Sequence, residues 1–184
     1  MKGIVFVELL KMAEDAFGED VVDHVLDKAN LENDGAFTAV GNYPCSELIK
    51  VVEAFSDHSG LSAEVLQRKF GHWMMEHFGE HYPDFFKNKS SSFELLEAVD
   101  GEIHVEVRKL YPDAELPRFE TTMVSDIEMD MAYSSPRPLV AFCHGLIEAS
   151  VDYFDQSAEI TRGETGQENN ETVFRIRVDQ KDTG

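Results

Sequence analysis

The spacing of the apolar residues changes once along this 184-residue chain, and that change limits the fold more than any other feature. Before Pro117, apolar residues recur three and four positions apart, which is typical of helices that bury one face. After it come two β-rich stretches, one further helical stretch and an alternating strand pair, at residues 121–124, 127–133, 139–153, 159–161 and 173–178. This order predicts an α+β fold, in which an N-terminal helical part packs on a small antiparallel sheet with an inserted helix.

The helical part is expected to hold five helices, with turn chemistry at Gly18 and across the irregular segment 31–44. Three of these helices have a serine placed to cap them, namely Ser46, Ser62 and Ser91. In the last, Ser91 and Glu94 form a capping box in which each accepts from the other's backbone N–H. That helix is expected to run to Tyr111 with an inner face made of Leu95 or Leu96, Val99, Ile103, Val107 and Leu110.

Acidic residues outnumber basic ones by 36 to 16, which gives a formal net charge of -20. Such a surface repels phosphate backbones and anionic membranes, so neither nucleic acid nor a membrane is expected as a partner. Solubility explains the excess of carboxylates, although a docking face for a basic partner would look the same. With 42% hydrophobic residues, residues 1–184 are expected to form a single domain with a flexible tail at about 180–184.

The two cysteines, Cys45 and Cys143, are too few and too isolated for a disulfide framework or a zinc site. They are interpreted as buried thiols in a reducing cytoplasm. The apolar N-terminus is interrupted by Glu8 and has no small-residue cleavage site, so it does not resemble a signal peptide. No stretch approaches the roughly 18 to 20 apolar residues that cross a bilayer. A cytoplasmic location is therefore expected.

His104 stands out among the seven histidines because it lies near the apolar face of its helix. Gly101, one turn earlier, would let a flat ligand approach. A lone histidine on such a face is more often structural, so the position alone does not assign a ligand. His77 and His81, four apart, could share a metal, but Gly79 lies between them, Tyr82-Pro83 follows at once and no glutamate has the zincin spacing. The remaining candidates have no constellation around them and are interpreted as surface or satisfied core residues: His24, His58 and His144.

A second group of functional residues lies in the sequence Tyr133-Ser134-Ser135-Pro136-Arg137-Pro138. Residues before proline favour extended backbone, and residues two apart in an extended chain share a face. Tyr133, Ser135 and Arg137 would then present a phenol, a hydroxyl and a guanidinium together. Such donors suit a pair of carboxylates or a phosphate. The alternative is a strand end whose arginine pairs with a nearby surface carboxylate.

Taken together, these residues resemble the haem nitric oxide/oxygen binding (H-NOX) family, stand-alone bacterial type, related to the haem domain of soluble guanylate cyclase. The resemblance spans nearly the whole chain. Its parts are the opening Met1-Lys2-Gly3-Ile4, the His104 helix with Leu116-Pro117, the Tyr133-x-Ser135-x-Arg137 signature and Gly145-Leu146-Ile147-Glu148. The signature with a histidine 29 residues upstream is specific, whereas each part alone is not.

The resemblance implies one ferrous haem b between the helical part and the sheet, with His104 as the proximal iron ligand. Tyr133, Ser135 and Arg137 would bind the haem propionates, and Pro117 would pack against the porphyrin and distort it. The apolar pocket would be lined by Ile4, Leu9, Met74, Phe78, Phe142 and Leu146.

The resemblance also implies which gas is bound. Oxygen-binding relatives carry a distal tyrosine where this chain has Phe142, and polar or indole groups where it has Leu9 and Met74. Bound dioxygen needs a hydrogen-bond donor, whereas nitric oxide binds ferrous iron strongly without one. The expected function is therefore a sensor that binds nitric oxide, and also carbon monoxide, and excludes dioxygen. It would not be an enzyme, and its effector would be a separate histidine kinase or cyclic-di-GMP enzyme.

Three alternatives remain. An oxygen sensor would need a distal donor such as Trp73 or Tyr43. A peroxidase-like haem enzyme would need an acid–base group such as His72 or His77. A haem-free adaptor would require His104 and the tyrosine–serine–arginine face to be structural only.

Overall fold

A computed structural model describes residues 1–179, so the tail predicted at 180–184 lies outside the described residues. The helical part contains α1 (Gly3–Phe17), α2 (Glu19–Lys28), α3 (Cys45–Ser59), α4 (Ala63–His81), α5 (Ser92–Ala98) and α6 (His104–Leu110). A 3-10 turn, η1 (Pro83–Phe85), follows α4, and a π-helical turn, η2 (Val99–Ile103), joins α5 to α6. The second part contains β1 (Arg118–Ser125), β2 (Glu128–Ser134), α7 (Val140–Tyr153), β3 (Ala158–Arg162) and β4 (Thr172–Val178). The predicted α+β fold is confirmed.

The four strands form one antiparallel sheet in the order β1-β2-β4-β3. A tight hairpin turn joins β1 to β2, and α7 lies in the chain between β2 and β3. Burial alternates along β2 and β4, so one face of the sheet packs against α7 while the other faces solvent. This face supplies a core that includes Met129, Met131, Phe174 and Ile176.

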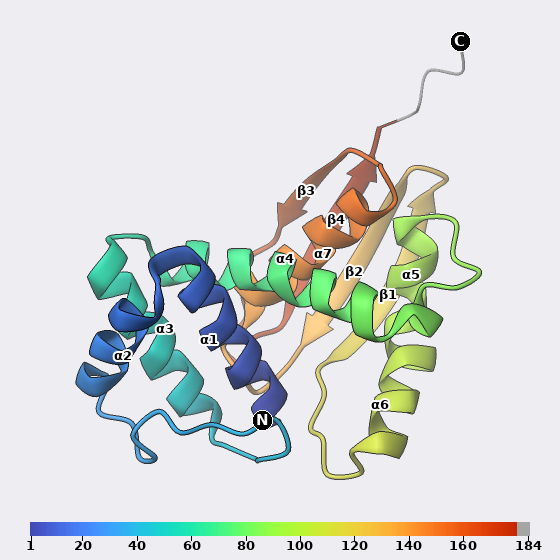
Figure 1. Cartoon of the computed structure of the whole chain (residues 1–184). Coiled ribbons are helices and arrows are strands. Elements are labelled where there is room, and N and C mark those ends of the chain that lie inside the picture. Colours follow the sequence, from blue (N-terminus) through green and yellow to red (C-terminus); the bar gives the residue numbers. More distant parts are fainter. Residues whose placement is uncertain (180–184) are drawn as a thin grey trace.

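Two hydrophobic cores divide the molecule, and Figure 1 shows α1, α2 and α3 gathered at one end with the sheet at the other. The first core packs α1 to α4 together, and the second packs α7 and α5 on the sheet. A small third cluster, which includes Met75, Leu95 and Ala149, joins α4, α5 and α7. The long helix α4 therefore belongs to one core and contacts the other.

The crossing of α4 and α7 depends on two glycines. A Cβ added to Gly71 would lie 2.5 Å from the carbonyl oxygen of Phe142, and one added to Gly145 would clash with the carbonyl of Arg68. Since real Cβ atoms do not approach backbone so closely, only glycine allows the two helix backbones to touch here. This contact fixes how the helical part sits on the sheet part.

The helix ends confirm some predicted caps and correct others. Gly18, at φ 86°, separates α1 from α2, and the Ser62 hydroxyl accepts from the backbone N–H of Val65. The cap predicted at Ser46 is wrong, because Pro44 already fixes an extended backbone and α3 begins at Cys45.

The predicted capping box is half correct. The Ser91 hydroxyl accepts from the N–H of Glu94 at 3.3 Å, as expected. The Glu94 carboxylate, however, accepts at 2.7 Å from the N–H of Ser90 rather than that of Ser91. Its other oxygen lies 2.9 Å from the Ser90 hydroxyl, which explains why the carboxylate turns to that residue.

The helix predicted to run uninterrupted to Tyr111 is instead broken by the π-helical turn η2. A π-turn holds one more residue than an α-turn, so it rotates everything after it relative to a 3.6-residue period. The predicted inner face therefore fails beyond Ile103. Leu110 is 62% exposed, whereas His104 is buried. None of the helices in residues 1–179 has both the length and the apolar character that crossing a bilayer requires.

Candidate cofactor site

His104 is the first residue of α6, immediately after the π-turn, and is only 9% exposed. Its Nδ1 atom is buried and lies 3.4 Å from Oδ1 of Asp100, in a geometry that falls short of a hydrogen bond. Burial lowers the pKa of His104, and the Asp100 carboxylate offsets this only partly. The imidazole is therefore neutral at neutral pH and able to act as a ligand.

The position of Asp100 indicates which ring nitrogen is available. A carboxylate beside Nδ1 favours the tautomer that carries the proton there, and this leaves the Nε2 lone pair for a metal. Carboxylate partners of this kind are usual for histidines that bind metals. Gly101, expected to admit a flat ligand, is exposed, and a Cβ there would contact no protein atom within 4 Å. Packing within the chain therefore does not require this glycine.

Tyr133 ends the buried face of β2 and is 4% exposed. Burial raises the pKa of Tyr133 to about 12, and the Ser135 hydroxyl only partly opposes this, so the phenol stays protonated and remains a donor. The Phe119 ring lies 5.6 Å from the Tyr133 ring and 5.7 Å from that of His104, between ring centroids. One phenyl ring thus contacts both predicted cofactor-binding residues.

Burial also alternates beyond the end of β2, as predicted for a shared face. Ser135 is buried and Arg137 half-buried, whereas Pro136 is exposed. The Ser135 hydroxyl oxygen accepts at 3.1 Å from the backbone N–H of Arg137. The Arg137 guanidinium donates to the backbone carbonyl of Glu115 and, at 2.7 Å, to its carboxylate. The carboxylate pairing considered for this arginine is therefore present in the structure.

The donor groups of these residues are those that a haem requires. A buried, neutral imidazole is the usual axial ligand of haem iron, and a phenol, a hydroxyl and a guanidinium suit two propionate carboxylates. Arg137 has five N–H donors, so the contacts with Glu115 do not exhaust it.

Most of the predicted apolar lining residues come together. Leu9 and Met74 are 3% and 1% exposed in the first core, and the half-buried Phe78, Phe142 and Leu146 pack against it. Phe78 and Leu146 also border the third cluster beside Ile103, the neighbour of His104. Ile4 and Pro117 are half-buried, the first on α1 and the second in the segment between α6 and β1. The apolar side chains thus extend from the helical core towards His104.

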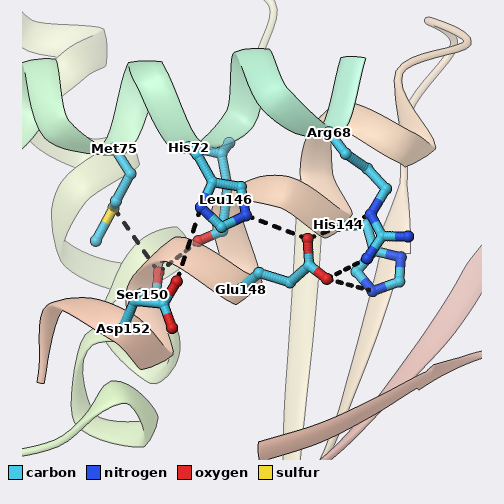
Figure 2. Close-up of polar contacts among 8 residues, drawn as sticks. All are labelled: Arg68, His72, Met75, His144, Leu146, Glu148, Ser150 and Asp152. Carbon is cyan, nitrogen blue, oxygen red and sulfur yellow. Dashed lines mark hydrogen bonds and ion pairs between the residues drawn. The ribbon is translucent and has the colours of Figure 1, made fainter. Parts of the chain in front are cut away.

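A polar cluster between α4 and α7 was not predicted, because its members are far apart in the sequence. Figure 2 shows the Glu148 carboxylate between His72, His144 and Arg68. Arg68 donates to both carboxylate oxygens, and the nearest imidazole nitrogens of His72 and His144 lie 3.3 and 3.7 Å from them. Hydrogen bonds from Arg68 and His72 outweigh the opposing effect of burial, so the pKa of Glu148 is lowered. The statement that His144 has no constellation is therefore wrong.

The groups proposed for alternative functions are all engaged within the chain. His72 faces Glu148 and Asp152, and His77 lies 3.4 Å from a buried carboxylate, that of Glu8. The same carboxylate accepts at 3.1 Å from the indole N–H of Trp73. The hydroxyl oxygen of Tyr43 accepts at 2.9 Å from the N–H of Thr38. His77 and His81 stack at 4.2 Å, but no group of three metal-ligating side chains surrounds them within residues 1–179.

Two surface cavities lie away from His104. One, of about 240 Å³, lies between α4, the start of α7 and the β3–β4 loop, and the other, of about 460 Å³, lies near Gln156. Neither is lined by a predicted cofactor-binding residue.

A helical part packed on a four-stranded antiparallel sheet is the fold of a class of haem-binding sensor domains. Residues 2–162 match the model of a family described as haem-NO-binding. The chain belongs to this family, the H-NOX family of haem-based gas sensors.

Solved structures agree with this assignment. The Fe(II) unliganded H-NOX protein from K. algicida is 32% identical over 100% of both chains, with a TM-score of 0.93. The IWP-051-bound H-NOX from Shewanella woodyi, in the Fe(II)CO state, is 35% identical, with 96% of this chain and 94% of that chain covered and a TM-score of 0.81. An oxygen-binding H-NOX domain related to soluble guanylate cyclases is 25% identical over 98% and 96%, with a TM-score of 0.80. No curated protein matches the chain.

Proposed function

We propose that the protein holds one ferrous haem b through His104, between the helical part and the sheet, and uses it to sense nitric oxide. The contact between the buried His104 and the partly exposed Asp100 carries this proposal. An imidazole kept neutral by burial, with a carboxylate beside Nδ1, is prepared to bind iron through Nε2. Tyr133, Ser135 and Arg137 would hold the propionates, and the half-buried Pro117 would pack against the porphyrin.

Ferrous haem with one histidine ligand supplies an open coordination position for a diatomic gas. The discrimination between gases would then come from the apolar cluster of Leu9, Met74 and Phe142. A pocket lined by these side chains offers no hydrogen bond to stabilise bound dioxygen, whereas nitric oxide does not need one. Carbon monoxide should also bind, as it does in the relative from Shewanella woodyi.

The engaged state of one donor supports this choice of gas. Trp73 donates its indole N–H to Glu8, so one of the two groups that an oxygen sensor would need already has an acceptor in the chain. The acid–base candidates His72 and His77 likewise face carboxylates, which favours a sensor over a peroxidase-like enzyme.

The signal would pass to a separate effector, a histidine kinase or a cyclic-di-GMP enzyme. A net charge of -20 would orient a partner that carries a basic docking face. The family assignment and this charge support the proposal, and effector assays with and without the gas would test it.

The first test is an absorption spectrum of the purified ferrous protein, recorded without oxygen, in air and with nitric oxide. The wavelength of the Soret band is expected to stay the same in air and to shift when nitric oxide is added. A stable change in air would instead indicate an oxygen sensor.

The iron ligand is tested with His104→Ala, with and without added imidazole. This variant should lose the wild-type spectrum and regain it with imidazole, whereas His24→Ala, at an exposed position of α2, should resemble the wild type. A wild-type spectrum for His104→Ala would contradict the assignment.

A further inference from the structure

The β3–β4 loop, residues 163–171, reaches back to the end of β2 and contacts one residue of the predicted propionate site from both sides. The N–H of Ser135 donates to the carbonyl oxygen of Asn169 at 2.7 Å. The carbonyl oxygen of Ser135 accepts from Nδ2 of Asn170 at 3.0 Å. Both backbone polar groups of Ser135 are therefore held by two consecutive loop residues.

The β3–β4 loop supplies the hydrogen-bond partners of the Ser135 backbone, which lies beyond the end of the sheet. The pairing of β2 with β4 ends at Tyr133 and Thr172, so no strand partner remains for Ser135. The next residue, Pro136, has no N–H to continue a ladder. Without the loop, the segment that carries the hydroxyl and the guanidinium would extend beyond the sheet with its backbone unsupported.

The conformation of the loop explains the choice of asparagine. Asn169 and Asn170 have φ angles of 52° and 48°, in the left-handed region that asparagine tolerates better than most residues. Two contacts close the loop on itself, since the N–H of Gly166 donates to Glu171 at 2.6 Å and the Thr172 hydroxyl donates to Gly163 at 3.1 Å. Asn170 is thus presented from a closed loop.

We propose that Asn170 is a positioning residue for the propionate site, which acts through Ser135. This inference rests on the proposed function. The connection is a chain of hydrogen bonds: Asn170 fixes the Ser135 carbonyl, and the Ser135 hydroxyl accepts from the N–H of Arg137. A shift of Ser135 would therefore move both the hydroxyl and the root of the arginine side chain.

The contribution to overall stability should be small, which separates positioning from a purely structural role. The loop is largely exposed, and Asn170 borders the cavity of about 240 Å³. A shorter side chain would give water a route to the Ser135 carbonyl, so that group would stay hydrogen-bonded after the substitution. Water would not hold the carbonyl in a fixed place.

The experiment compares Asn170→Gly with Asn169→Gly. Glycine accepts the left-handed backbone at both positions, and only the first exchange removes a side-chain hydrogen bond to Ser135, because Asn169 contributes its main-chain carbonyl. Haem loss from the loaded protein to excess apomyoglobin is measured, together with the propionate bending bands in the resonance Raman spectrum. Urea unfolding of each haem-free protein checks stability.

Asn170→Gly should lose haem about fivefold faster than wild type, the effect of one neutral hydrogen bond, with a shifted propionate band. Asn169→Gly should stay within about twofold, and both should unfold near the wild-type midpoint. Asn170→Asp should also lose haem faster, because a carboxylate would face the Ser135 carbonyl.

The outcomes separate this inference from the function beneath it. A wild-type protein that takes up no haem would overturn the proposed function itself. Equal haem loss from the two glycine variants, or a wild-type rate for Asn170→Asp, would overturn the role of Asn170 while leaving the haem site intact.

Discussion

Gly145 on α7 lies directly against the backbone carbonyl of Arg68 on α4, with no room for a side chain between them. The two helices belong to different hydrophobic cores, so this contact joins the helical part to the sheet part. Phe142 and Leu146 flank Gly145 on α7, and their positions relative to Met74 depend on how closely the helices approach.

Gly145→Ala should lower the free energy of unfolding by about 1–3 kcal/mol, the usual cost of overpacking. The carbonyl carbon and Cα of Arg68 also lie within 3.0 Å of the added Cβ, so relief requires the helix backbones to separate. Urea unfolding measures the change. Gly101→Ala is the matched control, because a Cβ there meets no atom within 4 Å, and its stability should be unchanged or slightly raised. Equal free energies of unfolding for the two variants would show that α4 and α7 can move apart at no cost in stability.

Removal of the Glu115 charge should have little effect on stability, whereas removal of the Arg137 charge should accelerate haem loss. The Glu115 side chain is 78% exposed, so Glu115→Gln should change the free energy of unfolding by less than about 1 kcal/mol. Arg137→Met should instead accelerate haem loss at least tenfold, because a charge-assisted contact to a propionate contributes about 1.5–3 kcal/mol. Arg175→Met, which breaks an ion pair with Asp130 on the exposed sheet face, is the control for losing a guanidinium. Equal haem loss from the two arginine variants would argue against Arg137 as an anchor.

His77 and His144, two histidines outside the candidate iron site, should make the protein sensitive to mild acid. Burial lowers the pKa of His77 and of His144, so the unfolded chain takes up their protons first as the pH falls. Stability should therefore decrease from about pH 7 downwards until the folded pKa values are reached. The Glu148 carboxylate, whose folded pKa is lowered, loses its contribution only at more acidic pH.

Urea unfolding between about pH 8 and pH 5.5 measures this slope. His144→Gln should flatten it, whereas the exposed His24→Gln should not. An unchanged slope for His144→Gln would mean that His144 is not protonated on unfolding.

A phenol introduced into the apolar cluster should allow the ferrous protein to bind dioxygen as well as nitric oxide. Phe142→Tyr adds one hydroxyl donor beside Phe70, whose ring centroid lies 5.0 Å from that of Phe142. The visible spectrum of the ferrous variant is expected to change in air, while that of the wild type does not. Phe17→Tyr, at the far end of α1, is the control. If air leaves Phe142→Tyr unchanged, the residue at position 142 does not decide whether oxygen binds.

The order of elements was predictable because it depends on local patterns. The 3.6-residue period predicted α1 to α5 and α7, the β-rich and alternating stretches after Pro117 predicted the four strands, and Gly18 predicted the first boundary. The shared face of Tyr133 and Ser135 was also predictable, since residue spacing in an extended segment determines it.

Contacts between distant segments were not predictable from one sequence. Glu148 meets Arg68 across 80 residues, and Asn170 meets Ser135 across 35. The π-turn was missed for a different reason, because one extra residue in a helix leaves the apolar pattern almost unchanged until the turn has passed.

The number of residues in that turn determines the direction in which the His104 side chain points. Deleting one residue other than Asp100 from Val99–Ile103 would restore a regular α-helix and turn the imidazole by about 100° around the helix axis. Every side chain of the site would still be present, yet the ring would no longer face the same way. One additional residue in the turn therefore determines the direction of the imidazole. A shortened turn would abolish ligand binding by His104 although the chemical groups of the site are unchanged.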